Sequence, residues 1–118
     1  MKLLKRSIGV LSELTNFSKD FGVSLLIEPL NRYSTPFCCN TADAIFILSK
    51  LNNDYFSILL DTYHMNIEEK DFSDSINKSK LFLKHIHFAD NNRRMPGLGH
   101  INFNSILKTL KKIQYTNY

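Results

Sequence analysis

Three stretches of the chain each place a side chain that can bind a metal at the end of an apolar run. These side chains are Glu28, Asp61 and His87. Two carboxylates and one imidazole form a mixed oxygen and nitrogen set, which suits Mn²⁺, Co²⁺ or Mg²⁺ better than metals that select thiolates. Taken singly, each residue is as easily explained as a helix cap, a solvated charge or a hydrogen-bonded histidine. Their joint occurrence at equivalent places predicts a shared metal site.

The apolar runs have the composition of buried β-strands. They cover Val23–Glu28, Ser57–Asp61 and Lys84–Phe88. The first is nearly continuous, as in a strand that is buried on both faces. Alternation along the third run places His85 on the same face as His87.

Four helix-like stretches flank these strands. They are residues 3–20, a second helix capped by Asn40 or Thr41, a third from Ser73 or Asp74 to about Lys80, and a last helix capped by Asn104. The side chains expected to face the core are Leu4, Ile8, Leu11, Leu14 and Phe17 or Phe21 in the first helix; Ala42, Ile45, Phe46 and Leu48 in the second; Ile76 with Leu81 in the third; and Ile106, Leu107, Leu110 and Ile113 in the last.

The alternation of helices and strands predicts an α/β fold with parallel strands and helices outside them. In a parallel βα barrel the C-terminal ends of the strands form the active face, so Glu28, Asp61 and His87 would meet on one rim. A closed eight-stranded barrel needs about 250 residues, whereas this chain has 118. We therefore expect residues 1–118 to form a single partial TIM (β/α)₈ barrel domain with about three parallel strands and four helices.

Composition and charge exclude several classes of protein. The net charge of +4 is spread over both ends of the chain and one loop, whereas nucleic-acid binders concentrate positive charge on one face. No stretch approaches the roughly 20 apolar residues of a membrane span, and the N-terminus does not resemble a signal peptide. Cys38 and Cys39 are adjacent, which disfavours a disulfide and suits a reducing compartment. We expect a cytoplasmic protein that binds neither nucleic acid nor a membrane.

Two further polar positions lie close to the predicted rim. His64 follows Asp61 by three residues, and its spacing allows either metal binding or a hydrogen bond to a polar ligand. Arg93 and Arg94 follow His87 in a loop that contains Pro96, Gly97 and Gly99. Glycine allows unusual backbone angles and close approach of a ligand. A plain solvated turn with two surface arginines explains this loop equally well.

Three segments together resemble the xylose isomerase-like barrels, and most closely the ketose (D-tagatose and D-psicose) 3-epimerases. The matching segments are Glu28-Pro29-Leu30-Asn31-Arg32-Tyr33, the nine residues from Asp61 to Glu69, and His87 with Asn92-Arg93 and Pro96-Gly97-Leu98-Gly99. The resemblance runs from about Leu4 to Tyr115. It implies a piece equivalent to the helix before barrel strand 5 through the helix after strand 7.

The resemblance also implies roles for individual residues. Glu28, Asp61 and His87 would be three ligands of a divalent metal, with Mn²⁺ expected first and Co²⁺ or Mg²⁺ as alternatives. Glu28 would also be a catalytic acid–base carboxylate. His64 and Arg93 would bind the hydroxyl and carbonyl oxygens of the substrate.

The activity implied is that of an isomerase of carbohydrate metabolism. A sugar epimerase of this type removes the proton at C3 of a 2-ketose, passes through a metal-assisted cis-enediolate and returns a proton on the opposite face. The substrate would be a small ketose or related sugar, and the full-length enzyme a homo-oligomer. Ser34 stands where many 3-epimerases carry a substrate-contacting glutamate, which leaves the particular sugar open.

The chain ends where the family would provide a fourth ligand and a second catalytic carboxylate. We therefore expect a fragment that is inactive alone and binds Mn²⁺ weakly. Two alternatives are an abasic-site endonuclease of the same barrel superfamily, suggested by Gly99-His100-Ile101, and a non-catalytic remnant.

Overall fold

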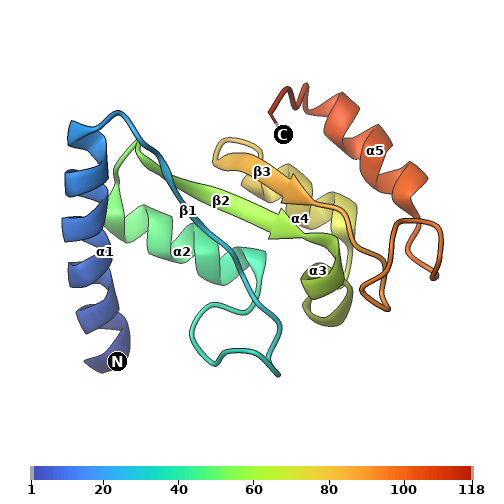
Figure 1. Ribbon diagram of the computed structural model, residues 1–118, viewed down its shortest axis with the longest axis horizontal. Helices are drawn as coiled ribbons and strands as arrows, with labels where there is room; N and C mark the ends of the chain where they lie inside the picture. Colours follow the sequence, from blue (N-terminus) through green and yellow to red (C-terminus); the bar gives the residue numbers. More distant parts are fainter. Residues whose placement is uncertain (1, 118) are drawn as a thin grey trace.

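The computed structural model of the chain describes residues 2–117, which contain three strands and five helices. The elements follow in the order α1 (Lys2–Asp20), β1 (Leu25–Ile27), α2 (Thr41–Leu51), β2 (Phe56–Asp61), α3 (Thr62–Glu68), α4 (Phe72–Ser79), β3 (Leu83–His87) and α5 (Phe103–Lys112). Figure 1 shows the strands side by side, with α1 at one end of the molecule and α5 at the other. Among these residues, no helix combines the length and the apolar character needed to cross a membrane.

The three strands form one parallel sheet in the order β1-β2-β3, as the sequence predicts. Ile27 lies opposite Ile58, and Asp61 lies opposite His87. A register irregularity falls between Ile58 and Leu59. Because the strands are parallel and in sequential order, their C-terminal residues come together at one edge of the sheet.

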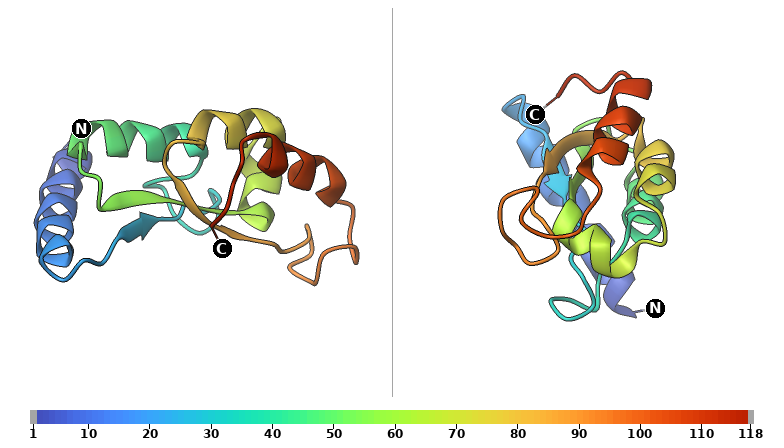
Figure 2. Two further views of the ribbon diagram at one scale, coloured as in Figure 1. Left: turned by 90° about the horizontal axis from the view of Figure 1, so that it is seen from above. Right: turned by 90° about the vertical axis from the view of Figure 1, so that its right-hand side faces the viewer.

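The helices cover one face of this sheet and leave the other face open (Figure 2, left). The buried apolar side chains lie mainly between the sheet and α2, α4 and α5: Cys38, Ala44, Ile47, Leu48, Phe56, Ile58, Leu60, Met65, Ile76, Leu83, Ile86, Ile101, Ile106 and Leu110. Ile58 and Leu60 point into this core, and strand alternation therefore turns Leu59 and Asp61 to the open face. The sheet thus presents its polar strand-end residues on the side that no helix covers.

Helix α1 is oriented differently from the prediction. Thr15 and Ser18 are buried, whereas Leu14 and Phe17 are 50% and 66% exposed. The two hydroxyls tolerate burial because each donates a hydrogen bond to a carbonyl of the preceding helical turn, at 2.6 and 2.9 Å. The predicted apolar stripe therefore faces the core only in part, because Leu11 packs against the core while Leu14 and Phe17 are exposed.

The predicted buried faces of the other helices are correct only in part. Ile76, Ile106 and Leu110 are buried as expected. In α2 Leu48 is buried and Ile45 packs against the core, both as predicted, while Ala44 and Ile47 are buried without having been predicted. Four side chains predicted to face inward are instead exposed: Ala42, Phe46, Leu81 and Leu107.

The caps explain where the helices begin. Asn40 caps α2, as predicted, by accepting a hydrogen bond from the backbone N–H of Asp43 at 2.9 Å. Helix α4 is capped by Asp71, and not by the predicted Ser73 or Asp74. Helix α5 is capped by Asn102, and not by Asn104. The short helix α3, which was not predicted, follows β2 without a loop and is capped by the last residue of that strand.

Candidate metal and substrate site

The structure brings Glu28, Asp61 and His87 together at the C-terminal edge of the sheet. His87 Nδ1 lies 3.9 Å from Glu28 Oε1 and 3.9 Å from Asp61 Oδ2. The Asp61 side chain is 12% exposed and that of His87 50% exposed, so the group has one sheltered and one open side. These three side chains are therefore neighbours at one edge of the sheet.

The two carboxylate oxygens of Asp61 have different partners. Oδ1 accepts a hydrogen bond of 2.8 Å from the backbone N–H of Tyr63 and so caps α3. Oδ2 faces His87. Capping by one oxygen fixes the direction of the other, which leaves Oδ2 available as a ligand.

His64 lies within the same cluster. A ring nitrogen of His64 and carboxylate oxygens of Glu28 and Asp61 lie within 4.8 Å of one another. The backbone N–H of Asn31 donates a 3.0 Å hydrogen bond to His64 Nδ1, and the side-chain amide nitrogen of Asn31 is 2.9 Å from the same atom. Two histidines therefore lie next to the carboxylates of Glu28 and Asp61. His64 accepts hydrogen bonds at Nδ1, whereas the side chain of His87 is half exposed to solvent.

Arg93 reaches this group from the loop after β3. Its guanidinium lies 4.6 Å from the centre of the Tyr63 ring, in a cation–π arrangement. Its Nη2 is 3.5 Å from His64 Nε2. All the sequence-predicted site residues, Glu28, Asp61, His64, His87 and Arg93, are thus gathered at one edge of the sheet.

Asp90 organises the loop that carries Arg93, and sequence reasoning missed it. Its carboxylate is fully buried and accepts hydrogen bonds from the backbone N–H groups of Asn91, Gly97, Gly99 and Ile101, at 2.9 to 3.1 Å. Burial alone would raise the pKa of this carboxyl, but the four donors outweigh it and hold the pKa below its usual value. The carboxylate therefore acts as the fixed centre of the loop.

The loop also depends on glycine at position 99. A Cβ atom there would collide with the side chains of Asp90 and Asn91, so only glycine fits without rearrangement. Arg93 itself has a positive φ of 61°, an uncommon conformation for a residue with a side chain. The backbone angle and the Asp90 network together fix how the guanidinium enters the site.

Two further contacts tie the loops at this edge together. Glu68 on α3 binds Arg32 through its backbone N–H at 2.6 Å and through its guanidinium at 2.9 to 3.2 Å. These hydrogen bonds from Arg32 lower the pKa of Glu68. The fully buried Thr62 hydroxyl donates to the carbonyl of Ala89 at 2.6 Å and accepts from its N–H at 2.9 Å. The opposite charges of Arg32 and Glu68 were the only signal in the sequence for their contact.

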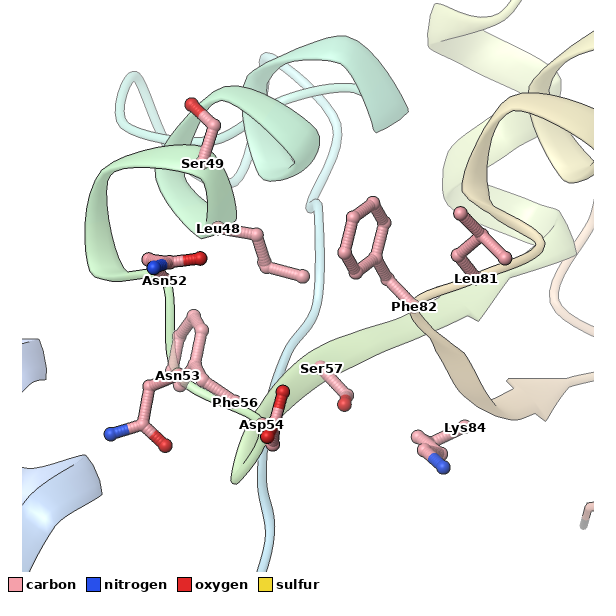
Figure 3. Close-up of a pocket in the computed structure, with 10 residues that line it drawn as sticks. All are labelled: Leu48, Ser49, Asn52, Asn53, Asp54, Phe56, Ser57, Leu81, Phe82 and Lys84. Atoms are coloured by element: carbon pink, nitrogen blue, oxygen red, sulfur yellow. The ribbon is translucent and has the colours of Figure 1, made fainter.

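A separate cavity of about 300 Å³ lies at the opposite end of the strands. Figure 3 shows Leu48 of α2 and Phe82, just before β3, pointing toward one another across it, with Lys84 directed away. It is formed around the start of β2 and β3 and includes none of the cluster residues. The chemistry-bearing groups therefore lie at the far edge from this cavity.

The donor set at the cluster fits a divalent metal with oxygen and nitrogen ligands. Two carboxylates supply hard anionic oxygens, and one imidazole supplies a neutral nitrogen, a combination that Mn²⁺ accepts readily. Next to these ligands, His64 and Arg93 can donate hydrogen bonds to oxygen atoms of a bound molecule. The arrangement is suited to binding an oxygen atom of a ligand beside a cation.

Comparison with known proteins shows which family the chain resembles. The profile of the family described as Xylose isomerase-like TIM barrel matches residues 2–118. The D-psicose 3-epimerase of Agrobacterium fabrum is 33% identical over 94% of this chain. The 3-dehydro-D-guloside 4-epimerase of Escherichia coli is 32% identical over 99% of it. The chain spans 38% and 44% of the lengths of these two relatives.

A solved structure shows the same arrangement of elements. The crystal structure of D-psicose 3-epimerase in the presence of D-fructose aligns with a TM-score of 0.93 and 32% identity. The alignment covers 97% of this chain and 39% of that one. The predicted partial barrel is therefore confirmed: the three strands and five helices correspond to one part of a TIM barrel.

Proposed function

The chain belongs to the Xylose isomerase-like TIM barrel family, and on that premise we propose that it carries part of a metal-assisted ketose 3-epimerase site. The observation that supports this most directly is the approach of His87 Nδ1 to within 3.9 Å of both Glu28 and Asp61. Several relatives bear the names ketose 3-epimerase, D-psicose 3-epimerase or L-ribulose 3-epimerase. The 4-epimerase among the relatives supports the reaction class without fixing the carbon.

In this proposal Glu28, Asp61 and His87 hold the metal, and Mn²⁺ is the ion that we propose. When bound, the cation would supply positive charge next to the oxygen on which negative charge develops as the adjacent C–H loses its proton. The Glu28 side chain is 31% exposed, so a sugar can reach this carboxylate from solvent.

The chain's own residues would bind the substrate and move its proton. His64 and Arg93 donate hydrogen bonds to sugar oxygens and so orient the ketose. Glu28 accepts the proton from the carbon beside the carbonyl group. Inversion at that carbon requires a second acid–base group on the opposite face of the sugar, and among the described residues we assign only Glu28 to such a role.

A chimera tests the proposed function directly. The 111 aligned residues of this chain would replace the corresponding 38% of the Agrobacterium fabrum D-psicose 3-epimerase, with the rest of that enzyme unchanged. We expect Mn²⁺-dependent interconversion of D-fructose and D-psicose, lost when Glu28 is changed to Gln. A folded chimera that binds Mn²⁺ and shows no epimerisation of any ketose tested would contradict the proposal. A Glu13→Gln chimera, changed on the outer helix α1, is the control that should keep its activity.

A further inference from the structure

Asn31 contacts the candidate substrate-binding histidine through two separate N–H groups. Its backbone N–H lies 3.0 Å from His64 Nδ1, and its side-chain nitrogen lies 2.9 Å from the same atom. Asn31 is 2% exposed and His64 4% exposed, so water does not compete for these contacts. A ring nitrogen that faces a backbone N–H must be the acceptor, because a backbone amide cannot reverse its polarity.

Hydrogen bonds also fix the orientation of the Asn31 side-chain amide. Its Oδ1 accepts a 3.0 Å hydrogen bond from the backbone N–H of Tyr33 and lies 3.4 Å from the hydroxyl of Ser34. Turning the amide over would place its NH₂ group against the Tyr33 N–H, and its oxygen against a ring nitrogen that already accepts a hydrogen bond from the backbone N–H of Asn31. The hydrogen-bond network therefore assigns Nδ2 to the side that faces His64.

We propose that Asn31 is a positioning residue that fixes the tautomer of His64. With Nδ1 held as an acceptor, the neutral ring carries its proton on Nε2. That N–H lies 3.5 Å from Arg93 Nη2, another donor, so the two groups cannot satisfy one another. They are instead placed to share one oxygen atom of a ligand, such as a carbonyl, hydroxyl or oxyanion oxygen.

The same assignment separates the roles of the two histidines in the cluster. A metal ligand must present an unprotonated nitrogen, and His64 presents a protonated Nε2 and an occupied Nδ1. His87, with a half-exposed side chain and Nδ1 toward both carboxylates, has no such constraint. The role of His64 as a substrate donor rests on the proposed function, whereas its tautomer rests on hydrogen bonds within the chain alone.

Ring protonation can be measured without substrate or metal. We would record long-range ¹H–¹⁵N correlation spectra of the ¹⁵N-labelled 118-residue chain in its neutral-histidine range, and assign the His64 ring by its loss in His64→Gln. The expected result is an unprotonated Nδ1 and a protonated Nε2. A protonated Nδ1 in the wild-type chain, in either the other tautomer or the imidazolium ion, would overturn the proposal.

Variants at Asn31 test whether this residue sets the tautomer. Asn31→Asp places a carboxylate against Nδ1, so the Nδ1 resonance should shift into the protonated range. Asn31→Ala keeps the backbone donor but removes the side-chain donor, so Nδ1 should stay unprotonated while the ring signals broaden. Unchanged His64 signals in folded Asn31→Asp would overturn the assignment to the side chain.

Asn40→Asp is the matched control for these spectra. It makes the same change of charge at a residue that caps α2 through its side-chain oxygen, which the aspartate retains. Its His64 signals should match the wild type. Because these spectra involve no turnover, failure of the tautomer assignment would leave the epimerase proposal standing, and an inactive chimera would leave the tautomer result standing.

Discussion

Replacing Asp61 by Asn separates the structural role of this residue from its proposed role as a ligand. The amide oxygen of Asn can still accept the 2.8 Å hydrogen bond from the backbone N–H of Tyr63 that begins α3. Asn and Asp are about equally good N-caps. The substitution removes only the negative charge and the anionic oxygen that faces His87.

The expected changes in stability follow from the cap. Asp61→Asn loses the favourable interaction of a carboxylate with a helix N-terminus, about 0.3–1 kcal/mol, and the seven-residue length of α3 favours the lower end. Asp61→Ala loses the capping hydrogen bond as well, which adds about 1 kcal/mol. Urea unfolding of the metal-free chain should therefore rank wild type, Asn and Ala in that order.

The expected loss of metal binding is larger. Replacement of groups that only support metal ligands already lowers affinity about 10–100-fold, so loss of a ligand carboxylate should lower it by at least ~10-fold. The assay is titration of Mn²⁺ followed by the electron paramagnetic resonance signal of the free ion. Asp71→Asn, which alters the cap of α4 in the same way outside the cluster, is the matched control for both measurements.

Two outcomes would contradict the assignment of Asp61 as a metal ligand. If Asp61→Asn binds Mn²⁺ within about twofold of the wild-type chain, Asp61 is a helix cap and not a ligand. If Asp71→Asn loses the same affinity as Asp61→Asn, the effect comes from general charge and not from the cluster.

Three other predictions concern the scaffold and are checked by urea unfolding. Gly99→Ala should destabilise the chain by about 1–3 kcal/mol, because the added Cβ would collide with the side chains of Asp90 and Asn91. Gly9 lies in a helix with open space around it, so Gly9→Ala should instead stabilise the chain by about 0.5–1 kcal/mol. The wild-type chain should be more stable than Glu68→Gln, and this difference should be fully present above pH ~4.3, the ordinary pKa of Glu. The difference should vanish as the pH falls through the lowered pKa of Glu68. A lowered carboxylate pKa stabilises the folded state only while the carboxylate is ionised. Ile76→Ala should cost about 2–5 kcal/mol because the side chain is fully buried, whereas Leu81→Ala, at 78% exposure, should stay within about 0.5 kcal/mol of wild type.

Each of these has a clear contrary outcome. Equal effects at Gly99 and Gly9 would mean that the loop can absorb a methyl group. A difference between wild type and Glu68→Gln that persists unchanged at pH 3 would mean that the ion pair is not its source. A large loss in Leu81→Ala would place that side chain in the core, as the sequence had suggested.

The strands and their chemical ends could be predicted from sequence because both signals are local. A nearly continuous apolar run marked the first strand, but its expected burial on both faces is wrong, because Leu26 is 37% exposed. Parallel connection through helices places the polar residue after each strand on a common rim. The prediction that Glu28, Asp61 and His87 converge needed only these two rules. Their assignment as ligands remains a proposal.

The parts that could not be predicted depend on tertiary contacts. The apolar stripe of α1 indicated a helix correctly, but the face that packs is chosen by the neighbouring elements, and these accept Thr15 and Ser18. Helix α3 was missed because Asp61 ends a strand and caps a helix at the same position. The role of Asp90 depends on donors up to eleven residues away along a folded loop.

The identity of the histidine that binds the metal tests the central claim most directly. We would load the 118-residue chain with saturating Mn²⁺ and measure hyperfine coupling to imidazole nitrogen by pulsed electron paramagnetic resonance, in the wild type and in His87→Gln and His64→Gln. We predict one coupled nitrogen, which disappears in His87→Gln and persists in His64→Gln. Loss of the coupling in His64→Gln with retention in His87→Gln would contradict it.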